Sequence, residues 1–320
     1  MNTESNKGTP STLSEIGELG AIDRIIRTLP GRQDVVVGAG DDCAVVQVNG
    51  DAIDDMVLTS DPVVAGVHFT ADATSESIGH KALGRVLSDI AAMGATPRWV
   101  LVDIVAPGET PIDVIDGIYH GMGALASEFS VAIVGGDMAE GLSLEIHVFG
   151  VGSAPANKSL LRSTASTSDL LFVTGKLGGS RLGRHLQVEP RINEGLFLRD
   201  WASAMIDVSD GLASDLRHLT DMSGVGCDID LENIPISDAA QGMDDGRSPV
   251  EHALYDGEDF ELLFTIKVER KQEFIAAWKT AFDLPCTQIG AITSDRDIIR
   301  CLNNGRDAIV LEQRGYTHFN

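Results

Sequence analysis

Short apolar runs alternate with longer stretches of helical periodicity from residue 15 onward. Runs of apolar residues, or strict apolar–polar alternation, are typical of strands, whereas apolar residues every three to four positions indicate helices. The N-terminal half contains both patterns. Its predicted strands are Val35–Val37, Met56–Thr59, Val100–Val105, Val131–Val134 and Leu144–Val148, and its predicted helices are Thr74–Gly94 and Ile112–Phe129. In the last of these strands Glu145 and His147 occupy the face opposite the apolar residues, which predicts a half-buried strand.

The C-terminal half repeats the same mixture. Its predicted strands are Leu170–Thr174, Gly226–Leu231 and Phe260–Ile266, and its predicted helices are Leu182–Leu186, Leu212–Met222 and Phe274–Phe282. The stretch 153–168 (SAPANKSLLRSTASTS) is rich in small and polar residues and is the best candidate for a domain boundary. We therefore expect a polar, disordered tail over 1–14 and two domains, 15–153 and 154–320. Strands and helices in both halves predict an α/β or α+β architecture.

The composition restricts the classes of partner. The chain has 320 residues, with 24 Lys and Arg against 48 Asp and Glu, so its net charge is −24. Binding to nucleic acid or to anionic lipid requires a basic surface, and this charge argues against both. No apolar run is long enough to span a membrane, and the N-terminus lacks the apolar core of a signal peptide. We therefore expect a cytoplasmic protein without nucleic-acid or membrane partners.

Familiar motifs offer no direct assignment of function. The four cysteines show no metal-ligand spacing, so we interpret them as reduced, small core residues. The chain has no GxxxxGK[ST], GxGxxG, HExxH or GxSxG motif. Any nucleotide site must be built in another way.

The acidic residues fall into two groups. Asp54-Asp55, Asp244-Asp245 and Glu269 lie on polar stretches and are interpreted as surface charge. In the second group an apolar strand runs into Gly or Ser and then Asp. Its segments are VVVGAGDD (Asp41, Asp42), MVLTSD (Asp61), VAIVGGD (Asp137) and AMIDVSDG (Asp207, Asp210). A turn or helix cap explains any one of them, but four together favour a ligand site at strand ends.

One further carboxylate stands out on the helix predicted over 74–94. At 100° per residue its apolar face comprises Ile78, Ala82, Val86, Ile90 and Met93, and Asp89 points inward with them. Lys81, Arg85 and Ser88 fall outside that face. An inward carboxylate needs a partner or a metal. Pairing with Arg85, four residues earlier, is one interpretation, and a shared site with the strand-end aspartates is the other.

Converging carboxylates would require a cation. Two of them 4 Å apart repel by about 4 kcal/mol at an effective dielectric constant near 20. Oxygen ligands favour Mg²⁺, Ca²⁺ or Mn²⁺, and Thr59 and Ser60 beside Asp61 add oxygens. There is no EF-hand spacing. Several Mg²⁺ ions with few nearby basic residues suggest a site for phosphates.

Taken in order, the motifs resemble the thiamine-monophosphate kinase family, which shares its fold with aminoimidazole ribonucleotide synthetase. The matching segments are GELGAIDRI, GAGDDCAVV, TSDPVVAGVHF, KALGRVLSDIAAMGATP, VGGD, VTGKLGGSRLG, EPR, IDVSDGLASDL, GEDFELLFT and GYTHF. The resemblance implies a two-domain fold whose N-terminal sheet domain binds ATP and Mg²⁺ and pairs in a homodimer. It also implies transfer of a phosphoryl group from ATP directly to thiamine phosphate. The acceptor oxygen is already ionised near pH 7, so no catalytic base is expected.

The resemblance assigns residues to three roles. The implied metal ligands are Asp42, Thr59, Ser60, Asp61, Asp89, Asp137, Asp207 and Asp210; the implied ATP contacts are Tyr119, Gly136, Asp137, Arg162 and Ser209; the implied thiamine phosphate contacts are His68, Glu258 and Phe319. Three of these residues have a structural alternative: Tyr119 as a packed helix aromatic, His68 as a structural histidine, and Phe319 as a packed chain end.

The chain departs from the family pattern at three places. Met138-Ala139-Glu140 stands where the family has Thr-Thr-Arg, Asp256 replaces a Gly before GED, and Gly179 and Arg181 replace Asp and Ala. These changes bear on substrate choice more than on phosphoryl transfer. Two other readings are open: another ATP-dependent enzyme of the superfamily, and a non-enzymatic, acidic binder of divalent cations.

Overall fold

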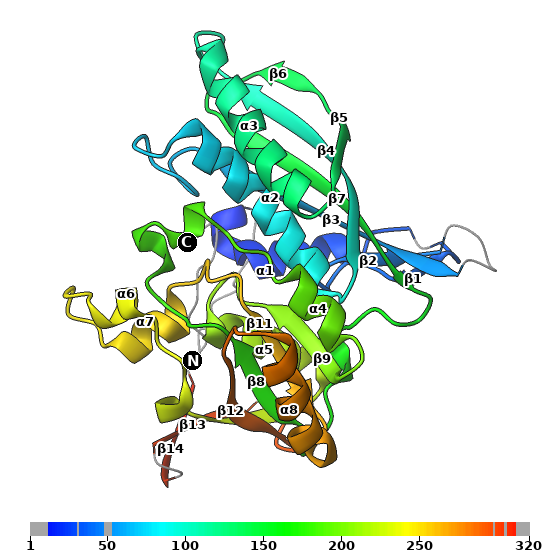
Figure 1. The fold of residues 1–320 in the computed structure, drawn as a ribbon, viewed down its shortest axis with the longest axis vertical. Helices are drawn as coiled ribbons and strands as arrows, with labels where there is room; N and C mark the ends of the chain where they lie inside the picture. The colour runs from blue at the N-terminus through cyan, green and yellow to red at the C-terminus, as the bar shows by residue number, and fades with distance from the viewer. Residues whose placement is uncertain (1–11, 31, 48–52, 297, 304–305, 312–320) are drawn as a thin grey trace, which may run out of the picture.

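The computed structural model describes residues 12–30, 32–47, 53–296, 298–303 and 306–311, which form two β-sheets with helices packed between and around them (Figure 1). The strands of the first sheet run in the order β1-β2-β3-β7-β4-β5, and β6 also pairs with β4. Their bounds are β1 Val35–Val37, β2 Ala44–Val46, β3 Asp54–Val64, β4 Thr96–Ala106, β5 Ala132–Gly135, β6 Met138–Glu140 and β7 Glu145–Pro155. The long strands β3 and β7 pair antiparallel over their whole length and form the centre of this sheet.

The second sheet has the order β14-β13-β10-β12-β8-β11-β9. Its strands are β8 Leu170–Thr174, β9 Ala202–Asp207, β10 Gly226–Asp230, β11 Leu262–Ile266, β12 Cys286–Thr293, β13 Ile299–Asn303 and β14 Arg306–Val310. Helix α5 contacts β9, β10 and β11, and α8 packs its Phe274 against Phe172 and Phe264 of the sheet. The predicted two-domain α/β architecture is confirmed.

The described helices connect and cover these sheets. The α-helices are α1 Leu13–Ile26, α2 Ser75–Ala92, α3 Ile112–Glu128, α4 Ile192–Leu198, α5 Leu212–Ser223, α6 Asp238–Gln241, α7 Pro249–Tyr255 and α8 Lys271–Ala281, and the 3₁₀ helices are η1 Arg162–Thr164, η2 Ser180–Leu182, η3 Arg184–Leu186, η4 Leu231–Asn233 and η5 Val268–Arg270. Most predicted elements therefore lie within a few residues of their observed bounds. None of the described helices is long and apolar enough to cross a lipid bilayer.

Helix α2 lies in the centre of the molecule (Figure 1). It packs on β3 and β7 and beside α3, and it also contacts α4, β9 and η3 of the C-terminal half. Lys81 and Ser88, predicted to fall outside the buried face, are 0% and 1% exposed. The prediction of a single buried face was incomplete because α2 has packing partners on both sides.

The other face of the first sheet is open and apolar. Leu58, Trp99, Leu101, Val134 and Phe149 are exposed there although they belong to regular strands. They line a shallow hollow together with Ser60 and Gly150. An exposed apolar patch of this kind is typical of a surface that meets another protein.

Four local expectations need correction or comment. Helix α1 begins at Leu13, inside the stretch expected to be a tail, because Thr12 and Glu15 form a capping box there. The helix expected over 182–186 is two 3₁₀ turns, since Gly179 and Gly183 have positive φ angles that interrupt it. Asp55 is not surface charge: it is 1% exposed, and one of its carboxylate oxygens accepts the Asn157 N–H. The cysteines are free thiols, and three of the four are buried.

Candidate active site

Three of the predicted metal ligands converge where the two halves of the chain meet. Carboxylate oxygens of Asp42, Asp89 and Asp207 lie within 4.8 Å of one another. Asp42 follows β1, Asp89 lies on α2 and Asp207 ends β9, so elements distant in sequence supply them. Asp42 and Asp207 are buried and Asp89 is half-buried.

This three-carboxylate cluster carries a strong electrostatic cost. Burial and the neighbouring carboxylate of Asp42 raise the pKa of Asp207 to about 7. Burial and then Asp61 raise the pKa of Asp89 well above its usual range. Oxygen donors that repel one another in a buried site fit a divalent cation, which would favour their ionised forms.

Hydroxyl groups orient two of the carboxylates. Thr59 Oγ1 on β3 donates to Asp89 Oδ2 at 2.5 Å, and Ser88 Oγ donates to Asp207 Oδ2 at 2.6 Å. The predicted ligand Ser60 points the other way. Because side chains alternate along β3, Ser60 faces the open apolar hollow rather than α2.

Arg162, the predicted ATP contact, is paired with the cluster. Its Nε and Nη2 donate to the two oxygens of Asp42 at 3.1 and 2.8 Å, and its main-chain N–H donates to Asp41. Burial and Asp42 raise the pKa of Asp41 to about 6, although Arg162 opposes this shift. A forked pair of this kind fixes the guanidinium beside the carboxylates.

Arg85 does not pair with Asp89 as one interpretation of the sequence proposed. Its Nε and Nη2 donate to the two oxygens of Asp61 at 3.1 and 3.0 Å, and its Nη1 lies 3.4 Å from Glu258 Oε1. Burial opposes its charge, but Asp61 and Glu258 outweigh burial and raise its pKa. Arg85 thus joins a predicted metal ligand to a predicted substrate ligand.

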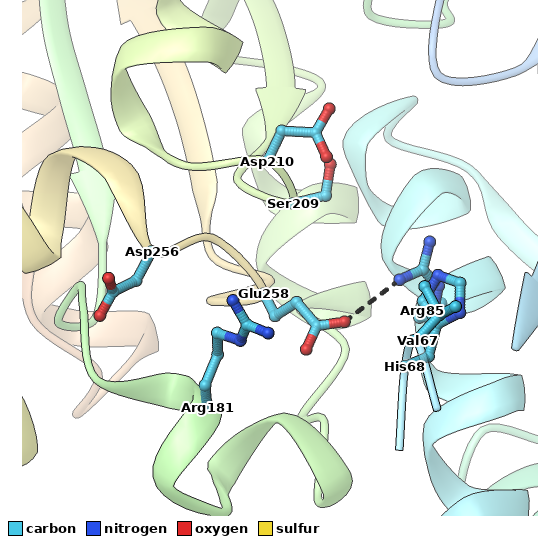
Figure 2. A pocket seen from close by; sticks show the side chains of 8 residues that line it. All are labelled: Val67, His68, Arg85, Arg181, Ser209, Asp210, Asp256 and Glu258. Carbon is cyan, nitrogen blue, oxygen red and sulfur yellow. Dashed lines mark hydrogen bonds and ion pairs between the residues drawn. The ribbon is translucent and has the colours of Figure 1, made fainter. Parts of the chain in front are cut away.

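A pocket opens beside this arginine (Figure 2). Its lining residues are Val67, His68, Arg85, Arg181, Ser209, Asp210, Asp256 and Glu258. It therefore brings together the predicted substrate residues His68 and Glu258 with the predicted metal ligand Asp210 and the predicted ATP contact Ser209. His68 Nδ1 accepts the N–H of Val64 at 3.0 Å, which leaves the proton of the neutral ring on Nε2.

Glu258 is held by a group of basic residues that the sequence did not predict. Lys81 Nζ donates to both Glu258 oxygens at 2.7 and 2.9 Å and to the carbonyl of His68, and His185 Nδ1 lies 3.0 Å from Glu258 Oε2. Burial alone would raise the pKa of Glu258, but His185, Lys81 and Arg85 lower it to about 2. Burial lowers the pKa of Lys81 to about 8 despite Glu258. We call Glu258, Lys81, His185 and Arg85 the Glu258 cluster.

The loop that carries Glu258 is held in an unusual conformation. Gly257 has φ +72, and a Cβ there would lie 2.7 Å from the Ser209 carbonyl. Glu258 itself has φ 56, a left-handed value that is strained for a non-glycine residue. Its N–H donates to Ser209 O at 2.6 Å, so the loop that carries Glu258 and the turn bearing Asp210 are tied together.

A second group of possible ligands follows this turn. Ligand atoms of Asp210, Asp215 and His218 lie within 4.8 Å of one another. Asp215 Oδ2 accepts the main-chain N–H of Asp210, and burial and Asp210 raise the pKa of Asp215 well above its usual range. Asp215 and His218 were not predicted. Their spacing from Asp210, at positions +5 and +8 on the following helix, was the available signal.

The remaining predicted nucleotide contacts lie farther along the first sheet. Gly136 passes so close to β4 that a Cβ would lie 1.8 Å from the Val102 carbonyl, and the Asp137 N–H donates to Asp103 at 2.8 Å. Strands β7 and β4 separate Asp137 from Asp61, a spacing of roughly 14 Å at about 4.8 Å per strand. Tyr119 on α3 is half-buried, and burial and Asp103 raise its pKa. The structure does not place Asp137 in the three-carboxylate cluster. Phe319 lies outside the described residues.

Comparisons with known proteins identify the family. The AIR synthase related protein family matches residues 40–154 with its N-terminal domain and 146–301 with its C-terminal domain. The thiamine-monophosphate kinase of Rhodopirellula baltica is 39% identical over 297 residues, which is 89% of this chain and 92% of the relative. The chain belongs to the thiamine-monophosphate kinase family.

Solved structures of that family have the same fold. A ThiL protein complexed with AMPPCP and TMP superposes with a TM-score of 0.84 at 30% identity, covering 97% of this chain and all of that one (100%). The thiamine-monophosphate kinase of Stenotrophomonas maltophilia gives a TM-score of 0.73 at 33% identity, covering 88% of this chain and 95% of that one. The family resemblance inferred from the motifs is confirmed.

Proposed function

We propose that the protein phosphorylates thiamine phosphate to thiamine diphosphate at the expense of ATP. The observation that carries this proposal is the position of the three-carboxylate cluster beside a pocket with a fixed, ionised glutamate. The cluster suits metal-bound phosphates, and the pocket suits an organic cation. The relatives' name and the TMP-bound ThiL structure support the choice of substrate.

The metal ligands would be Asp42, Asp89 and Asp207, together with Asp61, which is paired with Arg85, and Asp210, which lines the pocket. When bound there, Mg²⁺ supplies charge neutralisation for two phosphate-bearing substrates that otherwise repel each other. The protein's own groups orient the ligands: Thr59 fixes Asp89, Ser88 fixes Asp207, and Asp215 fixes the main chain at Asp210. By analogy with the family, we propose that several Mg²⁺ ions bind there.

The transfer step is a direct, in-line displacement. An oxygen of the acceptor phosphate forms a bond to the γ-phosphorus of ATP, the bond from that phosphorus to the β,γ-bridging oxygen breaks, and ADP leaves. The acceptor is largely ionised near neutral pH, so no group on the protein has to remove a proton. Positioning and electrostatic stabilisation then account for the rate enhancement.

Thiamine recognition would depend on Glu258 and His68. Glu258 stays ionised because its cluster lowers its pKa to about 2, so it can face a thiazolium ring at any physiological pH. His68 offers a neutral Nε2–H toward polar atoms of the ligand. Phe319, if it stacks on the rings as the resemblance implies, would complete this side.

The ATP contacts divide between two places. Arg162 and Ser209 lie at the carboxylate cluster and the pocket, where the transferred phosphate would be. Gly136, Asp137 and Tyr119 lie farther along the first sheet, a position that suits the remainder of the nucleotide and a second metal contact. We accordingly propose that 15–153 carries the dimer face and most of the ATP and metal contacts, and that 154–320 adds Arg162, Ser209 and the loop that carries Glu258.

The open face of the first sheet supports a homodimer. Trp99, Leu101 and Phe149 there are 47%, 46% and 41% exposed, which is costly for a monomer in water. A Trp99→Asp variant should shift the protein from dimer to monomer in sedimentation analysis. Val268→Asp, at an exposed apolar residue of η5, is the matched control and should leave the oligomeric state unchanged.

A single assay with two acceptors tests the function. With ATP and Mg²⁺, we expect thiamine diphosphate to form from thiamine phosphate, and no product from thiamine. Folded, Mg²⁺-loaded protein that turns over neither acceptor would indicate a different substrate within the superfamily. The ATP requirement and the free thiols of the four cysteines support a cytoplasmic location for such an enzyme.

A further inference from the structure

Two arginines in the substrate pocket have not been assigned a contact with either substrate. Arg85 on α2 and Arg181 on η2 both line it, and Figure 2 shows the Glu258 carboxylate between their side chains. The pocket therefore has cations on two sides of the residue proposed to meet the thiazolium ring. A carboxylate alone suffices for an organic cation, so the arginines require a separate explanation.

The Arg85 guanidinium is held in place, but some of its hydrogen-bond donors remain available. Two of its N–H groups bind Asp61 at 3.0 and 3.1 Å, and its contact with Glu258 is long, at 3.4 Å. Its side chain keeps 14% of its surface exposed, and the pocket is where that surface lies. A guanidinium has five N–H donors, so donors remain for an oxygen-rich ligand.

Arg181 is held in position through its main chain. The preceding glycine N–H groups donate to carboxylates, Gly178 to Asp259 and Gly179 to Asp256, and Ser180 Oγ donates to the Glu258 carbonyl at 2.6 Å. The turn that carries Arg181 is thus tied to the loop that carries Glu258. Its own side chain is exposed and has no ion pair within the part of the chain that the structure describes.

We propose that Arg85 and Arg181 bind the phosphate group of the phosphate-monoester substrate, and so select the phosphorylated acceptor over the free alcohol. Arginine donors match phosphate oxygens in pairs and form short, charge-assisted bonds with them. Thiamine phosphate carries a cation and a dianion, and the pocket presents a carboxylate flanked by guanidinium groups. The inference rests on the proposed function and adds the residues that choose between two acceptors.

The position of Arg85 would also distinguish the acceptor phosphate from the phosphates of ATP. Because Arg85 is bonded to Asp61, at the margin of the carboxylate cluster, a phosphate that it binds lies between Glu258 and the metal ligands. That is where an acceptor must lie to attack ATP. Arg162, the arginine proposed to contact ATP, is instead paired with Asp42 of the cluster.

The test compares a ligand with and without its phosphate. Binding of thiamine phosphate and of thiamine is measured by calorimetry, in Mg²⁺ and without nucleotide, for the wild-type protein and for Arg181→Met. We expect the variant to bind thiamine phosphate about tenfold more weakly, the loss typical of a charged hydrogen bond, with thiamine unchanged. Arg85→Met should lose more. Lys176→Met, which removes an exposed cation paired with Asp238 away from the pocket, is the matched control.

Each outcome decides the matter. Loss of the preference for thiamine phosphate over thiamine supports the proposal, because a purely structural role would weaken both ligands together. The proposal is overturned if the preference for thiamine phosphate is unchanged in Arg181→Met, in Arg85→Lys and in Arg85→Met. Arg85→Lys is included because it preserves the charge at a buried pair. If the wild-type protein still forms thiamine diphosphate in that case, the proposed function stands and only the arginine assignment fails. A wild-type protein that neither prefers thiamine phosphate over thiamine nor forms thiamine diphosphate overturns both the arginine assignment and the proposed function.

Discussion

The site contains two groups of residues, the three-carboxylate cluster and the Glu258 cluster. The surroundings shift the pKa of a carboxylate in opposite directions in the two groups. In the three-carboxylate cluster, burial and neighbouring acids raise the pKa of Asp207 to about 7. In the Glu258 cluster, basic neighbours lower the pKa of Glu258 to about 2 although burial opposes the shift. The first arrangement is incomplete without a cation from solution, whereas the second carries its own. The difference supports our proposal that the first is a metal site and the second a preorganised contact for substrate.

The largest expected effect comes from removing a carboxylate of the metal site. Asp207→Asn should lower kcat/KM by about 1000-fold or more, because it removes a ligand that acts in the transition state. The free energy of unfolding of the metal-free protein should stay level or rise, since a buried charge repulsion disappears. Steady-state kinetics and urea unfolding measure the two. Asp244→Asn, at an exposed position, is the control; a large stability loss with normal kinetics would instead make Asp207 structural.

The Glu258 cluster should respond in the opposite sense. Glu258→Gln leaves the buried Lys81 without its countercharge, so we expect a stability loss of about 2–3 kcal/mol together with a raised KM for thiamine phosphate. Adding Lys81→Met should recover part of that stability but not the KM. A double-mutant cycle by chemical denaturation measures the coupling, and simple additivity of the two substitutions would contradict a shared cluster.

The pH dependence of stability separates the two groupings without mutation. The folded-state pKa of Asp207 lies above its ordinary value of 3.8, so the folded protein binds more protons between about pH 4 and 7 and loses stability as the pH rises through that window. The pKa of Glu258 is lowered instead, so its contribution is complete above about 4.5 and is lost only toward pH 2. We therefore expect the metal-free protein to melt several degrees lower at pH 8 than at pH 5.5.

Adding Mg²⁺ should remove most of that difference in melting temperature. In Asp207→Asn the pH effect itself should be smaller, because one of the groups that titrate is gone. A melting temperature independent of pH over this range, with and without Mg²⁺, would mean that the carboxylates do not share a low-dielectric site.

The smallest expected effect concerns a hydroxyl group. Ser88→Ala removes the 2.6 Å hydrogen bond to Asp207 and should weaken Mn²⁺ binding about tenfold, with little change in the KM for thiamine phosphate. Ser127→Ala on α3, whose hydroxyl bonds only a helix carbonyl among the described residues, provides the control. Titration followed by electron paramagnetic resonance of free Mn²⁺ measures the affinity.

Local sequence patterns were sufficient for most of the framework. The bounds of β1 and β8 agree with the predicted strands, because short apolar runs ended by polar residues or glycine leave little choice. Helix α2 begins next to the predicted residue, since the Thr74 hydroxyl caps it through Ser77 N. The segments in which a strand ends in Asp also identified Asp42 and Asp207 correctly as neighbours of Asp89.

Three of the failures involve partners distant in sequence. The periodicity of α2 suggested Asp89 as the partner of Arg85, but the structure gives it Asp61 and Glu258, 24 and 173 residues away. Lys81 was assigned to the outside of the helix because nothing local shows that a second domain covers that side. Asp55 was taken as surface charge, yet it accepts a hydrogen bond from Asn157 across the end of the sheet. Burial by another part of the chain cannot be predicted from periodicity alone.

The central position of α2 bears on how the molecule unfolds. Helix α2 belongs by sequence to the first domain, but its Lys81 and Ser88 are buried by contacts with Glu258 and Asp207 of the second. Separating the halves would expose a lysine and a serine side chain that have no solvent contact now, along with two carboxylates. The two sheets should therefore melt in one cooperative transition, with equal calorimetric and van't Hoff enthalpies. A protein cut near residue 155 would yield two fragments that fold only when mixed.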